Sequence, residues 1–150
     1  MKKILIKTSG DVSGDKKLVE FAKRKAKTNN KVVIICGGGT QINHDLLQAG
    51  YKVKFGIHGR ILKSNKEEKI VRKVLEEERR GLEKKIKDKN ITVLSPILFA
   101  GSIHCHINGD NMIKAFYLGF DEIYVFTLKN RIKNKKEIFK NYPRVKIKGI

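Results

Sequence analysis

The sequence predicts an α/β protein in which a doubly wound, mostly parallel open sheet is sandwiched between helices. Three observations predict this class. Short apolar runs alternate along the chain with amphipathic segments of helical period, which is the order of strands and crossover helices in such sheets. The strand runs are rich in β-branched residues and nearly continuous, as in parallel strands covered on both faces. One of them, Val32–Ile35, leads into three glycines that open a helix.

Length and composition fit one globular domain. The chain has 150 residues, of which 40% are hydrophobic, and this is enough to build a core. No apolar run approaches the roughly 20 residues needed to cross a bilayer, and the N-terminus lacks the apolar region of a signal peptide. We therefore expect a cytoplasmic protein with no membrane partner. Cys36 and Cys105 lie in different apolar contexts, so we expect reduced thiols.

The formal net charge of +19 raises nucleic acid or an acidic surface as a partner class. Lysine outnumbers arginine, however, and the basic residues do not form one arginine-rich stripe with interleaved aromatic residues. A solvated lysine-rich surface is therefore favoured, and nucleic-acid binding is kept as a weaker alternative. The densest basic run, Lys129–Lys140, belongs to a basic C-terminal tail at about residues 128–150.

The first third of the chain is predicted to form two strand–helix units. Lys3–Lys7 is dominated by isoleucine and leucine, which predicts a buried strand. A helix follows, with Asp15 as its N-cap and an apolar stripe of Leu18, Val19, Ala22 and Ala26. The second strand, Val32–Ile35, then returns by a right-handed parallel crossover. The helix after it runs through Ala49, and Gly50 is suited to end it.

The middle of the chain is predicted to add a strand, a loop and a long helix. Tyr51–Ile57 alternates apolar and polar residues like a half-exposed strand, and Arg60 follows in a loop. Asn65–Lys89 is the longest helical segment and has one apolar side. Gly81 weakens it by about 1 kcal/mol relative to alanine, so a bend or break there is one alternative. This helix would cover the sheet or meet its counterpart in a dimer.

Next, Ile91–Phe99 is predicted to be a strand, with Pro96 marking a bend or its end. Ser102–Ile107 is predicted to return as a hairpin arm. In a strand, the two histidines of His104–His106 share one face and the cysteine takes the other. Because zinc needs four ligands and no second Cys/His pair is visible, structural or substrate-facing histidines are favoured over a metal site.

The last part of the chain is predicted to begin with a helix that starts at Asn108–Asn111 and ends at Gly119. Glu122–Thr127 is the last strand with a strong pattern. Val145–Lys148 is predicted to form a small edge strand.

The turn after the second strand has the clearest chemical meaning. Gly37, Gly38 and Gly39 let the backbone turn tightly and approach a ligand, because no Cβ blocks the way. The free amides at the start of the next helix, together with the helix dipole, attract an anion. We predict a phosphate or carboxylate site here, with a purely structural tight connection as the alternative. Lys7 ends the first strand, at the sheet edge where open α/β sheets bind ligands.

Four stretches together form a recognisable set: Ile4-Leu-Ile-Lys-Thr-Ser-Gly10, Cys36-Gly-Gly-Gly-Thr-Gln-Ile-Asn43, the strand and Gly-x-Arg element of Phe55–Arg60, and His106-Ile-Asn-Gly-Asp110. This set resembles the amino-acid kinase superfamily, and most closely the N-acetylglutamate kinases. The second stretch is similar to that family's His-Gly-Gly-Gly-Pro-Gln-Ile-Asn turn, and the fourth to its Asn-x-Asn-Ala-Asp helix start. Cys36 stands where the family has histidine, and His106 where it has asparagine.

The resemblance implies a transferase that moves a phosphoryl group from ATP, with Mg²⁺, to a carboxylate of the N-acylamino acid type or to a phosphate acceptor. Lys7 would neutralise the transferred group, and Asp110 would orient the catalytic lysines. The glycine turn and Gly10 would bind phosphate or the acceptor carboxylate, Arg60 would hold the substrate's carboxylate, and Asn108 would lie by the acceptor. Such a site acts by charge neutralisation and in-line positioning.

The resemblance covers the acceptor-binding lobe and the first strand of the nucleotide side. We therefore expect a single truncated kinase-like domain over residues 1–150 that omits the family's second catalytic lysine. A non-catalytic lobe that binds an anionic small molecule or a partner protein, without a cofactor, is the alternative function. A homodimer formed through the long helix or a sheet edge is the expected assembly.

Overall fold

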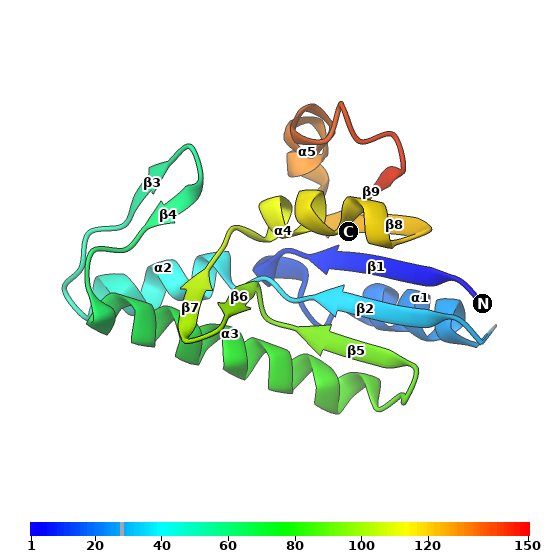
Figure 1. The fold of residues 1–150 in the computed structure, drawn as a ribbon, viewed down its shortest axis with the longest axis horizontal. Helices are drawn as coiled ribbons and strands as arrows, with labels where there is room; N and C mark the ends of the chain where they lie inside the picture. The colour runs from blue at the N-terminus through cyan, green and yellow to red at the C-terminus, as the bar shows by residue number, and fades with distance from the viewer. Residues whose placement is uncertain (28) are drawn as a thin grey trace.

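A five-stranded parallel sheet forms the centre of the fold in the computed structural model, which describes residues 1–27 and 29–150 (Figure 1). Its strand order is β5-β2-β1-β8-β9, and every neighbouring pair is parallel. The strands are β1 (Lys3–Thr8), β2 (Lys31–Ile35), β5 (Ile91–Leu94), β8 (Glu122–Thr127) and β9 (Val145–Gly149). The chain winds outward from β1 in both directions, so the crevice beyond β1 is where such a sheet binds ligands.

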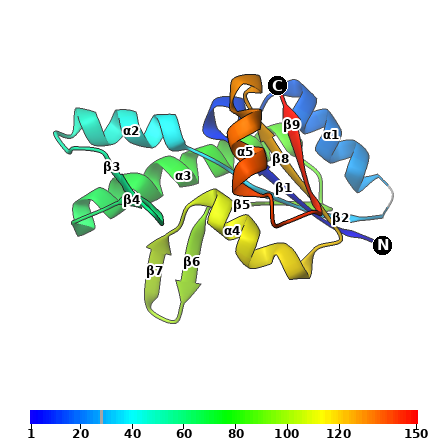
Figure 2. The same cartoon turned by 90° about the horizontal axis from the view of Figure 1, so that it is seen from above.

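Helices flank both faces of this sheet (Figure 2). One face is covered by α1 (Lys16–Ala26) and the C-terminal half of α3 (Asn65–Ile86). The other is covered by α4 (Gly109–Phe116) and α5 (Ile132–Ile138). The remaining helix, α2 (Gly39–Gln48), packs on the N-terminal half of α3 in a separate apolar cluster. The α/β class and the parallel sheet predicted from the sequence are therefore confirmed.

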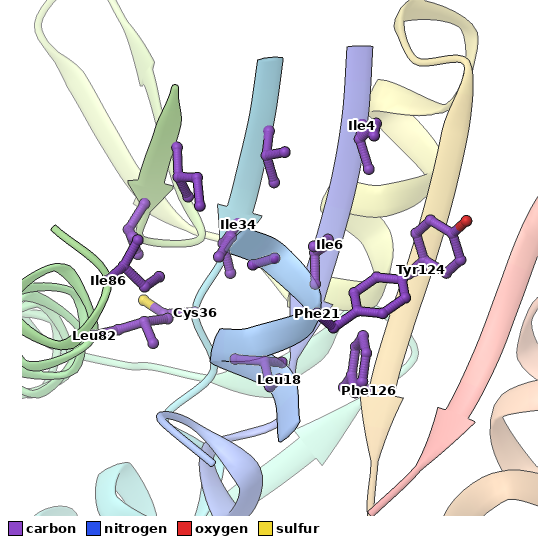
Figure 3. Packing of buried hydrophobic residues seen from close by; sticks show 14 of the residues in the cluster. Ile4, Ile6, Leu18, Phe21, Ile34, Cys36, Leu82, Ile86, Tyr124 and Phe126 are labelled. Carbon is purple, nitrogen blue, oxygen red and sulfur yellow. The ribbon is translucent and has the colours of Figure 1, made fainter. Parts of the chain in front are cut away.

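The core on the α1 side follows from the alternation of side chains along β1. Ile4 and Ile6 point to this face and are fully buried, while Leu5 packs on the opposite face (Figure 3). Phe21 of α1 meets Tyr124 and Phe126 of β8 edge-to-face, with ring centroids 4.8 and 5.2 Å apart. None of the helices in the described part of the chain combines the length and apolar character needed to span a bilayer.

The helices agree closely with the predicted segments. Asp15 caps α1 by accepting a hydrogen bond of 2.8 Å from the Lys17 amide. The long helix α3 ends at Ile86 and has no break at Gly81. Two features explain this continuity, since Leu82 is buried and an Arg79–Glu83 ion pair of 2.5 Å spans the glycine.

The expected strand Tyr51–Ile57 is too long and does not join the main sheet. Only β3 (Lys54–Gly56) is extended, and it pairs antiparallel with β4 (Gly59–Ile61) in a hairpin outside the main sheet (Figure 1). The free edge of β2 is taken by β5, so no place remains for this segment in the sheet. Arg60, expected in a loop, is therefore on a strand of the hairpin.

The expected strand Ile91–Phe99 is divided into two. After β5, the chain turns at Pro96 and forms β6 (Ile97–Ala100), which pairs antiparallel with β7 (Ile103–His106). The hairpin arm predicted for Ser102–Ile107 is thus confirmed. A proline lacks the amide that would continue the ladder with β2, which accounts for the division.

The basic segment at residues 128–150 is an integral part of the fold. It contains η3 (Lys129–Arg131), α5 and β9, and β9 is the predicted edge strand. Two further short helices are η1 (Gly10–Val12) and η2 (Tyr117–Gly119). Arg144 fastens this segment, since it donates to the carbonyls of Tyr117 and Phe120 at 2.7 and 2.8 Å. The helix α5 itself was not expected from the sequence.

Glu122 provides a test of how the sheet is held at its amino end. Its carboxylate lies 2.8 Å from the Lys2 ammonium and 2.6 Å from that of Lys25. Hydrogen bonds from Lys2, Lys25 and the Tyr124 hydroxyl lower the pKa of Glu122 to about 2. Because the folded pKa is below the ordinary value of 4.5, this stabilisation is present above about pH 4.5 and disappears as the pH falls toward 2.

We predict that Glu122→Gln lowers the free energy of unfolding at pH 7 by about 1 kcal/mol, with a smaller difference from wild type at pH 3. Urea unfolding at the two pH values measures this. The control is Glu20→Gln, which removes an exposed carboxylate 4.0 Å from Lys16 and should change stability by less than about 0.5 kcal/mol. An equal loss at both pH values would contradict the prediction.

Candidate functional site

A pocket of about 300 Å³ lies beyond the carboxyl ends of β1 and β2. The structure brings together every residue that the sequence singled out for the site, from four separate stretches of chain. All of them line the pocket: Lys7, Gly10, Gly37, Gly38, Gly39, Arg60, Asn108 and Asp110. They meet because the ends of parallel strands lie at one edge of the sheet, and the loops after β1 and β2 and the start of α4 all open there.

Asp110 is the centre of a buried group of charges. The Lys7 ammonium lies 3.3 Å from its Oδ1, and the Lys135 ammonium lies 2.5 Å from its Oδ2. The side chains of Lys7, Asp110 and Lys135 are only 9, 10 and 13% exposed. Asp110 is held in the first turn of α4, where the Asn108 side chain caps the helix by accepting from the Asp110 amide at 2.8 Å. One carboxylate therefore positions two ammonium groups.

Burial disfavours the charged forms of both Asp110 and Lys7, but it prevails only at Lys7. Burial would raise the pKa of Asp110, yet the ammonium groups of Lys7 and Lys135 outweigh it and hold that pKa below its ordinary value. The pKa of Lys7 is lowered, because burial outweighs the attraction of Asp110 and the Lys135 charge adds repulsion. A further negative charge at this point would favour the charged form of Lys7.

The start of α2 offers free backbone donors to the same pocket. Gly38 is the N-cap residue and has no side chain to cap the helix. The first intrahelical bond is from the Ile42 amide to the Gly38 carbonyl at 2.8 Å. Within the described residues, the amides of Gly39, Thr40 and Gln41 have no hydrogen-bond acceptor. The anion site predicted at this turn therefore has its donors in place.

The glycines of the site differ in what they do. A Cβ on Gly37 would lie 2.5 Å from the Thr8 carbonyl oxygen, and one on Gly10 would lie 2.5 Å from Gln41 Oε1. Gly37 is required for the β1 and β2 turns to pack together, because the atoms that its Cβ would meet are backbone atoms. At Gly10 the closest atom is the end of a flexible side chain, and the nearest backbone atom is 3.0 Å away, which is tight. A Cβ on Gly39 would have no atom within 4 Å. The structural alternative thus explains Gly37 and Gly10, but packing gives no reason for glycine at position 39.

Arg60 reaches the pocket from β4 and is anchored to α2. Its Nη2 donates to Asn43 Oδ1 at 2.6 Å and to the Gly39 carbonyl at 3.1 Å. Its Nε is buried without a hydrogen-bond partner, and its guanidinium lies 5.2 Å from the centre of the Phe55 ring. Arg60 forms no ion pair with any described residue, and burial lowers its pKa. It is a cation with unused donors that lines the pocket.

Four polar side chains of the pocket that pair with Asp110 or with one another were not predicted from the sequence. Lys135 and Arg131 belong to the basic run at Lys129–Lys140, which was taken as part of a tail. The crossover from β8 to β9 returns this run over the carboxyl ends of the strands. Thr40 and Asp11 complete the set: Thr40 Oγ1 donates to Asp11 Oδ1 at 2.6 Å, and Arg131 Nη1 lies 2.8 Å from Asp11 Oδ2.

The histidine pair is divided between the pocket and the surface. His106 lines the pocket, and burial together with the Arg60 charge lowers its pKa to about 4. It is therefore neutral at pH 7. His104 is exposed and meets Phe99 with ring centroids 4.7 Å apart. Among the described residues, no group of three or more His, Cys, Asp or Glu side chains is arranged to hold a metal ion.

The pocket has more positive than negative charge. Its basic side chains are Lys7, Arg60, Arg131 and Lys135, and its carboxylates are those of Asp11 and Asp110. Two positive charges are left over, in a pocket that also presents free amides at a helix start. This arrangement is complementary to a dianion such as a phosphate group.

We predict that Asp110→Asn lowers the free energy of unfolding by about 3 kcal/mol, because it leaves buried ammonium groups without a counter-charge. Adding Lys7→Met should restore part of this loss, since the unpaired buried charge is then removed. Urea unfolding of the two single variants and the double variant gives the coupling energy. Additive effects, with coupling below about 0.5 kcal/mol, would contradict the buried ion pair.

Comparison of the sequence with known protein families and with curated proteins gave no match.

Proposed function

We propose that this chain is a small phosphotransferase of the amino-acid kinase type, which moves a phosphoryl group from ATP to a carboxylate or phosphate acceptor. The observation that carries the proposal is the position of two ammonium groups, from Lys7 and Lys135, on either oxygen of Asp110. Of the residues at the start of α2 whose amides have no acceptor among the described residues, Gly39 and Thr40 line the same pocket. A phosphoryl group bound there would meet positive charge from both sources.

Phosphoryl transfer asks a protein mainly for positioning and charge neutralisation, with little covalent chemistry. The buried lysines meet this requirement, because their charges act in a region of low dielectric constant and are already oriented by Asp110. The amides of α2 add fixed dipoles that need no reorganisation during the reaction. Lys135 takes part here as a second ammonium group, although the family resemblance predicted that the second catalytic lysine is missing.

The part of the pocket around Arg60 supports a carboxylate acceptor. Arg60 has unused donors there, and a guanidinium binds a carboxylate through two parallel hydrogen bonds. The neighbouring wall is apolar or neutral, and its members are Phe55, Leu75, Pro96 and His106. A carboxylate with a short, uncharged body, as in an N-acylamino acid, would suit both features.

The chain's own residues do not fit a Mg²⁺ site. Asp11 is held by Thr40 and Arg131, and Asp110 by Lys7 and Lys135. Mg²⁺ is commonly held by one or two carboxylates together with substrate phosphates, and both carboxylates here already have cationic partners. We therefore assign the neutralisation of phosphate charge to the lysines, the arginines and the amides of α2.

A non-catalytic anion-binding lobe is the second candidate. The ion pairs Asp11–Arg131 and Asp110–Lys135 are the observation that favours it. They connect the segment after β8 to the pocket and neutralise two of its four cations internally, so the pocket would be suited to binding without turnover.

Turnover separates these two candidates. We predict that the protein consumes ATP in a coupled assay with an N-acylamino acid or nucleoside monophosphate as acceptor. Lys7→Met should lower the rate by at least about 100-fold, the usual effect of removing one group that stabilises transition-state charge. Lys3→Met makes the same change at the exposed start of β1 and should keep full activity.

Thermal shift measurements with the same ligands complete this test, because a ligand that binds the folded state raises the melting temperature. Stabilisation by phosphate, ATP or an acceptor without turnover would contradict the transferase function and support the non-catalytic anion-binding lobe. No stabilisation by any of these anions would contradict both candidates.

Gly39 tests whether the ligand approaches the glycine turn. We predict that Gly39→Ala weakens phosphate binding by about tenfold or more, because the new methyl group enters open space in front of the α2 amides. Its stability should be unchanged or up to about 1 kcal/mol higher. Calorimetric titration with phosphate and urea unfolding measure the two effects.

The matched control is Gly81→Ala on α3, where the added Cβ also has no neighbour within 4 Å. It should raise stability by a similar amount and leave phosphate binding as in wild type. Unchanged phosphate binding by Gly39→Ala would exclude the glycine turn as the anion site.

A further inference from the structure

A second polar cluster lies beside the proposed phosphoryl site and is formed by Asp11, Thr40 and Arg131. Asp11 is in the short helix η1 after β1, Thr40 is in the first turn of α2, and Arg131 ends η3. The Asp11 carboxylate accepts from Thr40 Oγ1 at 2.6 Å and from Arg131 Nη1 at 2.8 Å. All three residues line the same pocket as Lys7.

In this cluster the Asp11 carboxylate occupies the position that the anionic group of a bound ligand could take. Thr40 and Arg131 are both of the residue types that bind phosphate, and a guanidinium can do so through two hydrogen bonds. The hydrogen bond from Thr40, followed by the charge of Arg131, lowers the pKa of Asp11 despite some burial. The start of α2 adds the positive end of a helix dipole.

A buried hydroxyl adds an independent sign of a ligand. Ser9 is only 8% exposed, and its Oγ has no hydrogen-bond partner among the described residues. Ser9 lines the pocket with Lys7 before it and Asp11 after it in the same turn. A buried hydroxyl without a partner is costly unless a ligand or water satisfies it.

We propose that Thr40 and Arg131 bind a second phosphate of the ligand, so that the pocket takes a compound with two linked phosphates. The carboxylate of Asp11 holds this second position until the ligand displaces it. The inference rests on the proposed function, because the first phosphate is the one bound by Lys7, Lys135 and the glycine turn. Ser9 donates its hydroxyl to the bound phosphates.

This exchange would also change the charge of the pocket. While Asp11 is paired with Arg131, the two charges cancel. When the carboxylate moves away, the guanidinium is free, and the excess positive charge of the pocket rises by one. The pocket would then select a linked diphosphate over a single phosphate, because the diphosphate carries the greater negative charge.

Calorimetric titration with inorganic phosphate and with pyrophosphate, at one fixed ionic strength, tests the proposal. Wild type should bind pyrophosphate more tightly than phosphate. Arg131→Gln should weaken pyrophosphate binding by about tenfold and phosphate binding by less than about twofold. Asp11→Asn should strengthen pyrophosphate binding by about threefold or more, because the competing anion is lost.

Two control variants have the same charge changes on α3, at residues that do not line the pocket. Arg80→Gln removes a guanidinium that is ion-paired with Glu76 on α3, and Glu77→Gln removes an exposed carboxylate 4.0 Å from Lys73. Neither should change the ratio of the two affinities by more than about twofold. Melting temperatures of all variants show that each one is folded. Arg131→Lys keeps the positive charge but lacks the planar guanidinium that can donate two parallel hydrogen bonds, so it should give an intermediate loss of pyrophosphate binding.

Three results would overturn the proposal. An equal loss of phosphate and pyrophosphate binding in Arg131→Gln would show that Arg131 contributes only its positive charge and does not bind a second phosphate. Weaker pyrophosphate binding in Asp11→Asn would show that Asp11 holds the ligand and does not compete with it. Phosphate binding by wild type without a preference for pyrophosphate would remove the second subsite and leave the proposed function intact. Binding of neither anion would contradict the proposed function itself.

Discussion

The buried contact between Asp110 and the two lysines is the interaction on which the site depends. It joins three elements that are far apart in the sequence: the end of β1, the first turn of α4 and the helix α5. Burying three charged groups has a large desolvation cost, which is offset only when each charge has a partner at close range. The arrangement therefore fixes the ammonium groups in one place. A pocket formed this way is preorganised for an anion before any ligand arrives.

The sheet topology brings these charges to the glycine turn. Because β1 lies beside β2, the loops after these two strands face each other closely, and a Cβ on Gly37 would collide with the backbone of the turn after β1. The same closeness aims the first amides of α2 at the pocket. Tight packing and anion binding are thus two consequences of one turn. Only Gly39, which has open space around it, separates them.

Much of this could be predicted from the sequence, because it depends on local patterns. Apolar runs predicted β1, β2 and β8, and the rule that strand ends meet at one edge placed Lys7 beside the glycine turn. Asn108 and Asp110 were assigned to the site only by the family resemblance. The positions of Arg131 and Lys135 could not be predicted. They follow from the parallel pairing of β9 with β8, and a lysine-rich segment has no local pattern that shows where it packs. The misplaced strand at Tyr51–Ile57 has a similar cause, since β5 occupies the edge that this segment would need.

The central claim is that backbone amides at the start of α2 bind an anion beside Lys7. Titration of inorganic phosphate into ¹⁵N-labelled protein, followed by amide chemical shifts, tests this most directly. The account predicts that the amides of Gly39, Thr40 and Gln41 move furthest and reach saturation, together with those of the turn after β1. Shifts spread over the lysine-rich surface of α3 without saturation, and none at these three amides, would contradict it.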